Sequence, residues 1–335
     1  MRLKRDIWRK SSVGGIFTGR SVGQSGVGTN EAYGVDGSFA FYDNLAINAY
    51  WAQTRTRELT GDATSYRTQL DYTGDRYGVQ LERLVVGDSF NPEVGFLRRG
   101  DMRRSFGQFR FSPRPRSNKR IRRFFSMGSL AYIENGAGRL ETRDRDAEFA
   151  IEFHNGDRFN VAYGDTYEFL PQPFAIASGV TIPTGSYEFA NFRTGFNLGQ
   201  QRRLAGSASV EHGTFYSGHK TTLSLSRGRV HVTPQLSIEP RISVDWVDLP
   251  EGSFTSRLVG SRATYTMTPL MFVSALVQYN AGNHTVAANV RLRWEYQPGS
   301  ELFVVLNEQR NTLTERFPDL ENRSVIVKFN RVFRF

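Results

Sequence analysis

The chain has 335 residues with no cysteine, 26 Phe, 14 Tyr, 32 Gly and a formal net charge of +10. Its mean hydropathy is −0.45, and it contains no run of about eighteen apolar residues, which excludes a transmembrane helix. Low mean hydropathy does not exclude a membrane β-barrel, because a barrel strand exposes only every second side chain to lipid. The basic segment Met1–Ile7 is not followed by an apolar stretch or a cleavage site, so we expect the chain to be the C-terminal part of a longer precursor.

Taken in order, the sequence predicts strand after strand and no helix, because apolar residues recur at every second position. Turn signals such as Gly74-Asp75 and Asn135-Gly136 separate several of the segments. These patterns predict about eighteen strands. The predicted segments are Arg9–Arg20, Ala32–Tyr42, Leu45–Thr56, Ser65–Thr73, Arg76–Val86, Arg103–Phe111, Arg122–Glu134, Arg139–Phe153, Arg158–Tyr167, Tyr187–Leu198, Arg203–Phe215, Thr221–Arg229, Gln235–Trp246, Phe254–Met267, Met271–Tyr279, Thr285–Tyr296, Leu302–Gln309 and the terminal run Glu321–Phe335.

Two long connections interrupt this pattern, Gly87–Gly100 and Glu168–Gly185. Both contain proline, and long irregular loops in compact domains are commonly functional. We expect them to form a lid or an inward-folded constriction. If the C-terminus is periplasmic, short turns fall on one rim and longer loops on the other, an asymmetry typical of outer-membrane barrels and not of soluble sandwiches.

The terminal run Glu321–Phe335 also bears on the choice between these two folds. It alternates apolar and polar residues and ends on an aromatic residue, as the last strand of an outer-membrane barrel does. An edge strand of a soluble sandwich is the alternative for this segment alone. An aromatic girdle at the headgroup level is predicted to contain Trp51, Trp246, Trp294, Tyr296, Phe333 and Phe335.

Each predicted strand has a polar face opposite its apolar one. In Thr285–Tyr296, apolar residues occupy the even positions, and two of the odd ones are Arg291 and Arg293. Charged groups cannot cheaply face lipid, so these faces are expected to line a lumen. The predicted lumen-lining residues are Arg139, Glu141, Arg143, Arg145, Glu239, Arg241, Asp245, Asn289, Arg291, Arg293 and Glu295.

Two interpretations of these charges remain open. In an open pore, an arginine series favours anions, or orients sugars and phosphates through bidentate donors. In a plugged barrel, the same arginines pair with glutamates and conduct nothing. Acidic residues lie beside the basic ones in the sequence, which favours the plugged or narrow interpretation.

Several blocks resemble one known family. They include Phe153–Phe159, Gly213–Gly218, Val247–Phe254 and, most specifically, Asn289–Val304. Over nearly its whole length the chain is similar to the barrel domain at the C-terminus of Gram-negative envelope proteins that carry an N-terminal carbohydrate-binding family 9-like domain. The resemblance implies an outer-membrane β-barrel and no particular reaction.

The predicted fold is therefore an all-β, transmembrane antiparallel barrel of about eighteen strands. It forms a single domain over residues 1–335, with periplasmic termini. The predicted location is the bacterial outer membrane. The predicted function is that of a channel, a transport component or a membrane anchor for the carbohydrate-binding-like domain.

The expected partners follow from this location. They are outer-membrane lipid and lipopolysaccharide, the barrel-assembly machinery through the C-terminal strand, and sugars or anionic solutes. A basic cluster suits contact with anionic lipid, but a solvated periplasmic turn is the favoured interpretation. Its members are Arg114, Arg116, Lys119, Arg120, Arg122 and Arg123. Nucleic acid is not expected, because the arginines are scattered at strand spacing. No cofactor or metal is predicted.

A barrel enzyme, such as a hydrolase, is the alternative function. His212 and His219 fall at the ends of adjacent predicted strands, and with Glu211 they form the best candidate for an acid–base or metal site at the rim. Their spacing matches no metal motif, so no catalytic residue is assigned.

Overall fold

The computed structural model describes residues 1–21, 28–57, 59–202, 205–313 and 319–332. All the secondary-structure elements among these residues are β-strands, which confirms the all-β prediction. No helix in this part of the chain is long and apolar enough to cross a membrane. The strands are β1 Arg2–Trp8, β2 Ser11–Arg20, β3 Asn30–Phe41, β4 Leu45–Thr56, β5 Thr64–Thr73, β6 Tyr77–Val86, β7 Met102–Phe111, β8 Ile121–Glu134, β9 Leu140–Phe153, β10 Arg158–Leu170, β11 Phe174–Ala177, β12 Val180–Ile182, β13 Gly185–Leu198, β14 Gly206–Phe215, β15 Gly218–Arg227, β16 Val230–His231, β17 Leu236–Leu249, β18 Gly252–Thr268, β19 Met271–Asn280, β20 Thr285–Gln297, β21 Ser300–Asn311 and β22 Asp319–Phe329.

Each predicted segment corresponds to one of these 22 strands, and four strands are additional: β1, β11, β12 and β16. β1 pairs with β2, and the Met1 amino group donates to the Phe17 carbonyl, partway along β2. The terminal strand ends at Phe329, earlier than predicted. Backbone pairing continues one residue further, between Asn330 and Glu301. Phe333 and Phe335, and the predicted strand start at Arg203, lie outside the described residues.

The chain divides into two compact units. Unit 1 comprises residues 1–151, 162–174 and 183–190, and unit 2 comprises residues 152–161, 175–182 and 191–335. The residues of β9, β10, β11 and β13 are therefore divided between the units.

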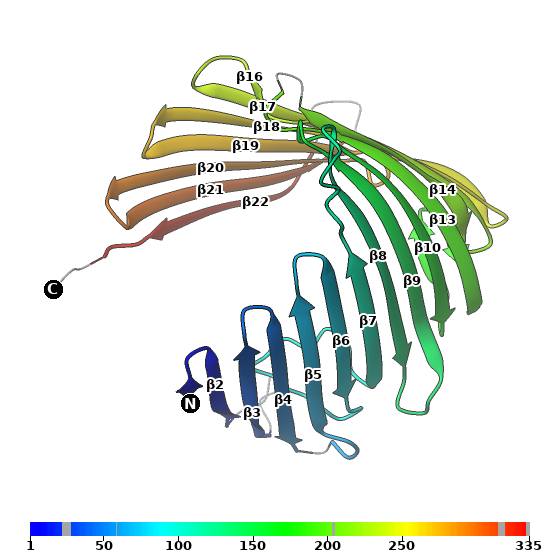
Figure 1. Ribbon diagram of the computed structural model, residues 1–335, viewed down its shortest axis with the longest axis vertical. Helices are drawn as coiled ribbons and strands as arrows, with labels where there is room; N and C mark the ends of the chain where they lie inside the picture. The colour runs from blue at the N-terminus through cyan, green and yellow to red at the C-terminus, as the bar shows by residue number, and fades with distance from the viewer. Residues whose placement is uncertain (22–27, 58, 203–204, 314–318, 333–335) are drawn as a thin grey trace. The chain divides into compact units, whose positions relative to one another are not determined.

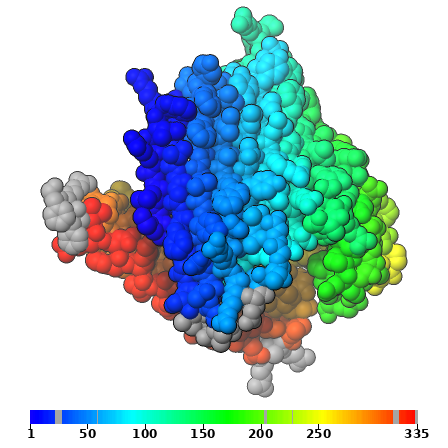
Figure 2. Space-filling view, turned by 90° about the horizontal axis from the view of Figure 1, so that it is seen from below, coloured from blue at the N-terminus to red at the C-terminus, as the bar shows by residue number. Residues whose placement is uncertain are grey.

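Unit 1 contains an antiparallel meander from β1 to β8 (Figure 1). Its first strands form one continuous surface, blue to cyan in Figure 2. Directly opposite residues share a face, so Val35, Trp51 and Tyr66 lie in one row across β3, β4 and β5. We call this side the apolar face of unit 1. The other side, which carries Asp36, Arg67 and Glu82, is its polar face.

Unit 2 contains a second meander, from Asn191 in β13 to β22. β15 and β16 both pair with β17 and are separated by two residues. Trp246 and Trp294 mark the apolar face of unit 2, whereas Asp245 and Arg262 mark its polar face. Because side chains alternate along a strand, one register step would exchange these two faces.

Candidate functional site

The polar face of unit 1 is built around Glu82 on β6, which is 8% exposed. Arg67 on β5 donates through Nε to Glu82 Oε2 at 2.6 Å, and Arg104 on β7 pairs with Oε1. Arg67 also contacts Gln69, whose amide donates to Asp71 at 2.7 Å. The charges of this face are thus largely neutralised by neighbours on adjacent strands.

The connection between β6 and β7 is tied to the same face. Asn30 on β3, which is 1% exposed, donates to the Asn91 carbonyl at 2.8 Å, and the Asn91 amide donates to Thr54 Oγ1 at 3.0 Å. Glu93 pairs with Arg20. Figure 1 shows this connection in cyan, crossing β3–β5. The loop predicted to fold inward therefore runs back over the polar ends of β2, β3 and β4.

The β9 residues predicted to line a lumen are held by ion pairs. Glu141 pairs with Arg99 of the β6–β7 connection. Arg143 contacts Glu188 and, at 3.4 Å, Asp165, which also lies 3.7 Å from Arg145. Arg139 precedes β9, and its guanidinium lies 4.1 Å from the centre of the Phe169 ring. The structure brings these residues together with partners on β10, β13 and the connection.

In unit 2, β17 and β20 carry the other predicted lumen residues on one face. Glu239 lies opposite Arg262, which lies opposite Leu276, which in turn lies opposite Asn289. The polar face is therefore continuous from β17 to β20. Asp245 accepts a hydrogen bond from Thr222 at 2.7 Å.

Several polar residues of this face are paired across strands. Asn289 donates to Asn307 at 2.5 Å, and Arg293 donates through Nε to Glu301 at 2.9 Å. Glu295 accepts the Gly299 amide at 3.0 Å. These contacts fix the side chains near the β20–β21 turn.

Three arginines of unit 2 differ from Arg67, Arg104 and Arg143 of unit 1, which pair with carboxylates. Among the described residues of unit 2, no carboxylate forms an ion pair with Arg241, Arg262 or Arg291. All three are exposed. The neighbouring Glu239 is engaged by Arg229 at 2.8 Å. This face therefore keeps guanidinium groups whose donors are open to a solute.

The second long connection forms a small hairpin, β11–β12. Val180 and Ile182 are 6% and 0% exposed, and Val247 and Leu249 at the end of β17 are equally buried at 5% each. Val180 approaches Gly252, where an added Cβ would lie 3.0 Å from its Cγ2. The hairpin is thus fastened to the β17–β18 turn within unit 2.

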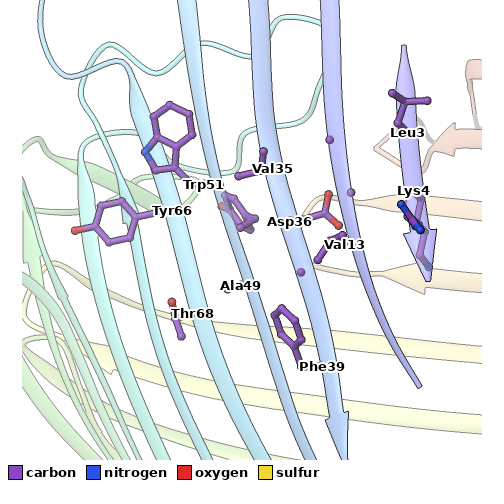
Figure 3. A pocket seen from close by; sticks show the side chains of 15 residues that line it. Leu3, Lys4, Val13, Val35, Asp36, Phe39, Ala49, Trp51, Tyr66 and Thr68 are labelled. Atoms are coloured by element: carbon purple, nitrogen blue, oxygen red, sulfur yellow. The ribbon is translucent and has the colours of Figure 1, made fainter. Parts of the chain in front are cut away.

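The apolar face of unit 1 contains a hollow of about 1050 Å³. Trp51, Tyr66 and Phe39 line it (Figure 3), together with small residues such as Ala49 and Gly37. A Cβ at Gly37 would lie 2.6 Å from the Phe39 ring, so glycine lets this ring pack over the strand, as expected for a glycine within a barrel strand. The hollow belongs to the side predicted to face lipid.

The predicted girdle residues within the described chain lie on apolar faces. Trp51, Trp246 and Trp294 are 40%, 45% and 44% exposed. The Tyr296 ring packs edge-on to Trp294 at 6.0 Å and stacks on Phe329 at 5.3 Å. Their contact with lipid headgroups stays a prediction.

The candidate enzyme site is only partly assembled. The rings of His212 and His219 lie parallel with centroids 6.3 Å apart, and His212 Nδ1 is 2.8 Å from Thr221 Oγ1. Glu211, however, points to the opposite face of β14, as its alternating position requires, and lies 3.5 Å from Lys220. Within the described ranges, no group of three His, Asp or Glu side chains is arranged to hold a metal.

Sequence reasoning missed Glu82 and its two arginines as members of the polar face. Arg67, Gln69 and Asp71 alternate along β5, and this signal was available in the sequence. Their common partner was not, because the register that sets Gln69 opposite Glu82 comes from the β5–β6 pairing.

A rim turn of unit 2 holds a buried carboxylate, Asp157, which is 6% exposed. The Gly199 amide donates to it at 2.9 Å, and Arg202 donates at 2.6 Å. The hydrogen bond from the Gly199 backbone, followed by the charge of Arg202, holds the pKa of Asp157 below its usual value. This side chain links the turns that follow β9 and β13.

No family model and no curated protein matches the chain. Among solved structures, it is similar to a ferric enterobactin receptor, PfeA, with a TM-score of 0.50 and 9% identity over 95% of this chain and 72% of the receptor. A mutant of that receptor from Pseudomonas aeruginosa gives a TM-score of 0.49 and 10% identity over 97% and 73%. The copper transporter OprC gives 0.45 and 10% over 97% and 68%. Together with the antiparallel strands, the first similarity confirms the predicted fold class, an all-β antiparallel barrel.

Proposed function

We propose that this chain is an outer-membrane barrel that takes part in transport, with its polar faces in contact with solutes. The observation that carries the proposal is the continuous polar face of unit 2, on which Arg241, Arg262 and Arg291 have no carboxylate partner among the described residues of that unit. Unpaired guanidinium groups facing lipid would be costly, whereas facing water they attract anions. The receptor of similar fold is named for ferric enterobactin, which agrees with a transport-related role.

The apolar faces support the membrane location. Large side chains such as Trp51, Tyr66 and Trp246 are strongly exposed there. A soluble protein would leave such a surface in contact with water at a large free-energy cost. In a bilayer, aliphatic residues meet the acyl chains and tryptophan meets the headgroups.

A second candidate is a membrane anchor with a filled interior, which carries the carbohydrate-binding-like domain expected from the family resemblance. The observation that favours it is the polar face of unit 1. There Arg67 and Arg104 pair with Glu82 and Arg20 pairs with Glu93, and the β6–β7 connection covers strand ends. A lumen lined by such a face would conduct ions poorly.

Planar-bilayer recording from the refolded full chain separates the two candidates. Steady conductance under a salt gradient, with anions preferred, supports the transport role. Replacing Arg291 together with Arg139 and Arg143 by glutamate should weaken or reverse that preference. Silence from protein whose insertion is verified by protection from trypsin would overturn the transport role and favour the anchor.

A further inference from the structure

A pocket of about 420 Å³ lies on the polar face of unit 2, over β18, β19 and β20. Three arginines and three hydroxyl side chains line it, beside Phe272, Leu276 and Asn289. The polar lining residues that matter here are Arg229, Arg262, Arg291, Thr264, Thr266 and Ser274. Small-molecule sites commonly have this size, with a few polar groups that converge on one space.

The strand register builds this arrangement. Thr264 lies opposite Ser274, which lies opposite Arg291. Arg262 is two residues before Thr264 on the same face, so the hydroxyls lie between the two arginines. Thr264 Oγ1 donates to Ser274 at 3.5 Å, a long contact that leaves both hydroxyls able to bind a ligand.

The charge balance of the pocket is positive. Arg229 is engaged by Glu239 at 2.8 Å, and no carboxylate lines the pocket. Arg262 and Arg291 form no ion pair with the carboxylates described in unit 2. A guanidinium presents a planar fork of donors that matches a carboxylate or phosphate in a bidentate manner.

We propose that this pocket binds a small organic anion through a phosphate or carboxylate group. The anionic group contacts Arg262, Arg291 and the hydroxyls between them, and the apolar part of the ligand packs on Phe272 and Leu276. The inference rests on the proposed function, since a solute reaches the pocket only if the polar face is accessible.

Binding to the refolded full chain in detergent micelles tests this inference by calorimetry. The probes are phenyl phosphate, benzoate and, as a neutral counterpart, benzyl alcohol. We expect the two anionic probes to bind and the neutral probe not to bind. Comparing the affinities of phenyl phosphate and benzoate shows which of the two anionic groups the pocket prefers. Arg262→Gln and Arg291→Gln should each weaken binding about tenfold, as loss of a charged hydrogen bond predicts.

The matched control is Arg257→Gln. It removes the same charge from the same unit, but Arg257 lies opposite Val244 on the apolar face, so binding should be unchanged. Arg262→Lys retains charge while losing the fork, and should bind between wild type and Arg262→Gln. Equal loss of binding in the Arg257 control, or equal binding of the neutral probe, overturns the inference.

Conductance recorded from the same preparations keeps the two hypotheses apart. A barrel that conducts but binds no anion overturns the pocket alone. One that binds the anion but does not conduct overturns the transport role alone. Variants with a wild-type unfolding midpoint exclude misfolding as the reason for lost binding.

Discussion

In unit 1, Arg67 and Arg104 share the buried Glu82, whereas in unit 2 Arg262 and Arg291 line an open pocket without a carboxylate. The connections differ in the same sense. Unit 1 folds the long β6–β7 connection over its polar face, while in unit 2 the β11–β12 hairpin of the second long connection packs at the β17–β18 turn. Arg67 and Arg104 are therefore neutralised within unit 1, whereas Arg262 and Arg291 of unit 2 stay available to solutes.

This difference shows that alternation alone does not decide what a charged face does. In both units, side chains alternate between the two faces of each strand. The strand register then determines which residues of the neighbouring strands they meet. Where the register places a carboxylate between two arginines, the polar face is structural. Where the register places serine and threonine between two arginines, the polar face can bind an anion.

The largest effect is expected from Glu82→Gln. The substitution leaves two arginines beside a group that no longer carries charge, and should lower the free energy of unfolding by about 2 kcal/mol. Urea unfolding of the refolded protein measures it. Glu239→Gln in unit 2 is the matched control and should cost less than about 1 kcal/mol, because the Glu239–Arg229 pair is partly exposed. Equal losses would contradict the contrast between the two faces.

A smaller effect is expected at the tether of the β6–β7 connection. Asn30→Ala removes the buried amide that binds the Asn91 carbonyl and should release the connection. Trypsin cleavage at Arg98 and Arg99 should then accelerate about tenfold, corresponding to about 1.4 kcal/mol. Ser38 lies on the same strand as Asn30, and Ser38→Ala removes a hydrogen bond to Asn48 on β4, away from the connection. It should leave cleavage unchanged. Similar rates in both variants would show that the connection is not tied at Asn30.

The smallest effect concerns pH and the rim of unit 2. The pKa of Asp157 is lowered in the folded protein, so its ionised form stabilises the fold above the unfolded pKa. This contribution is lost as the pH falls through the lower, folded pKa. Asp157→Asn should therefore reduce stability at pH 7 and flatten its decline in acid, measured by unfolding midpoints from pH 7 to pH 3. A variant with the wild-type acid slope would exclude this role.

The strand pattern was largely predictable from the sequence because side chains alternate between two environments. The Thr285–Tyr296 segment, with apolar even positions and arginines on odd ones, corresponds to β20. β1 was missed because Lys4, Arg5 and Asp6 are consecutive charges that obscure the alternation. β11 and β12 were missed because each is short and lies among prolines and glycines.

The partners on the polar faces were not predictable in the same way. The sequence identified Arg143 and Arg291 as members of such faces, but gave no register. Only the pairing of strands shows that Arg143 contacts Asp165 and that Arg291 lies opposite Ser274. The approach of His212 to His219 was predictable from the hairpin. The separation of Glu211 from these two histidines follows from the alternation of side chains along the strand, which the predicted enzyme site did not take into account.

The contrast between the paired arginines of unit 1 and the unpaired arginines of unit 2 is tested most directly by ion selectivity in planar bilayers. The measured quantity is the reversal potential under a potassium chloride gradient. The variant Arg241→Gln/Arg262→Gln/Arg291→Gln neutralises the arginines without carboxylate partners on the polar face of unit 2. Its control, Arg83→Gln/Arg103→Gln/Arg257→Gln, removes three charges from apolar faces. We predict anion preference in the wild type and the control, and its loss in the first variant. Equal reversal potentials in all three proteins would contradict the account.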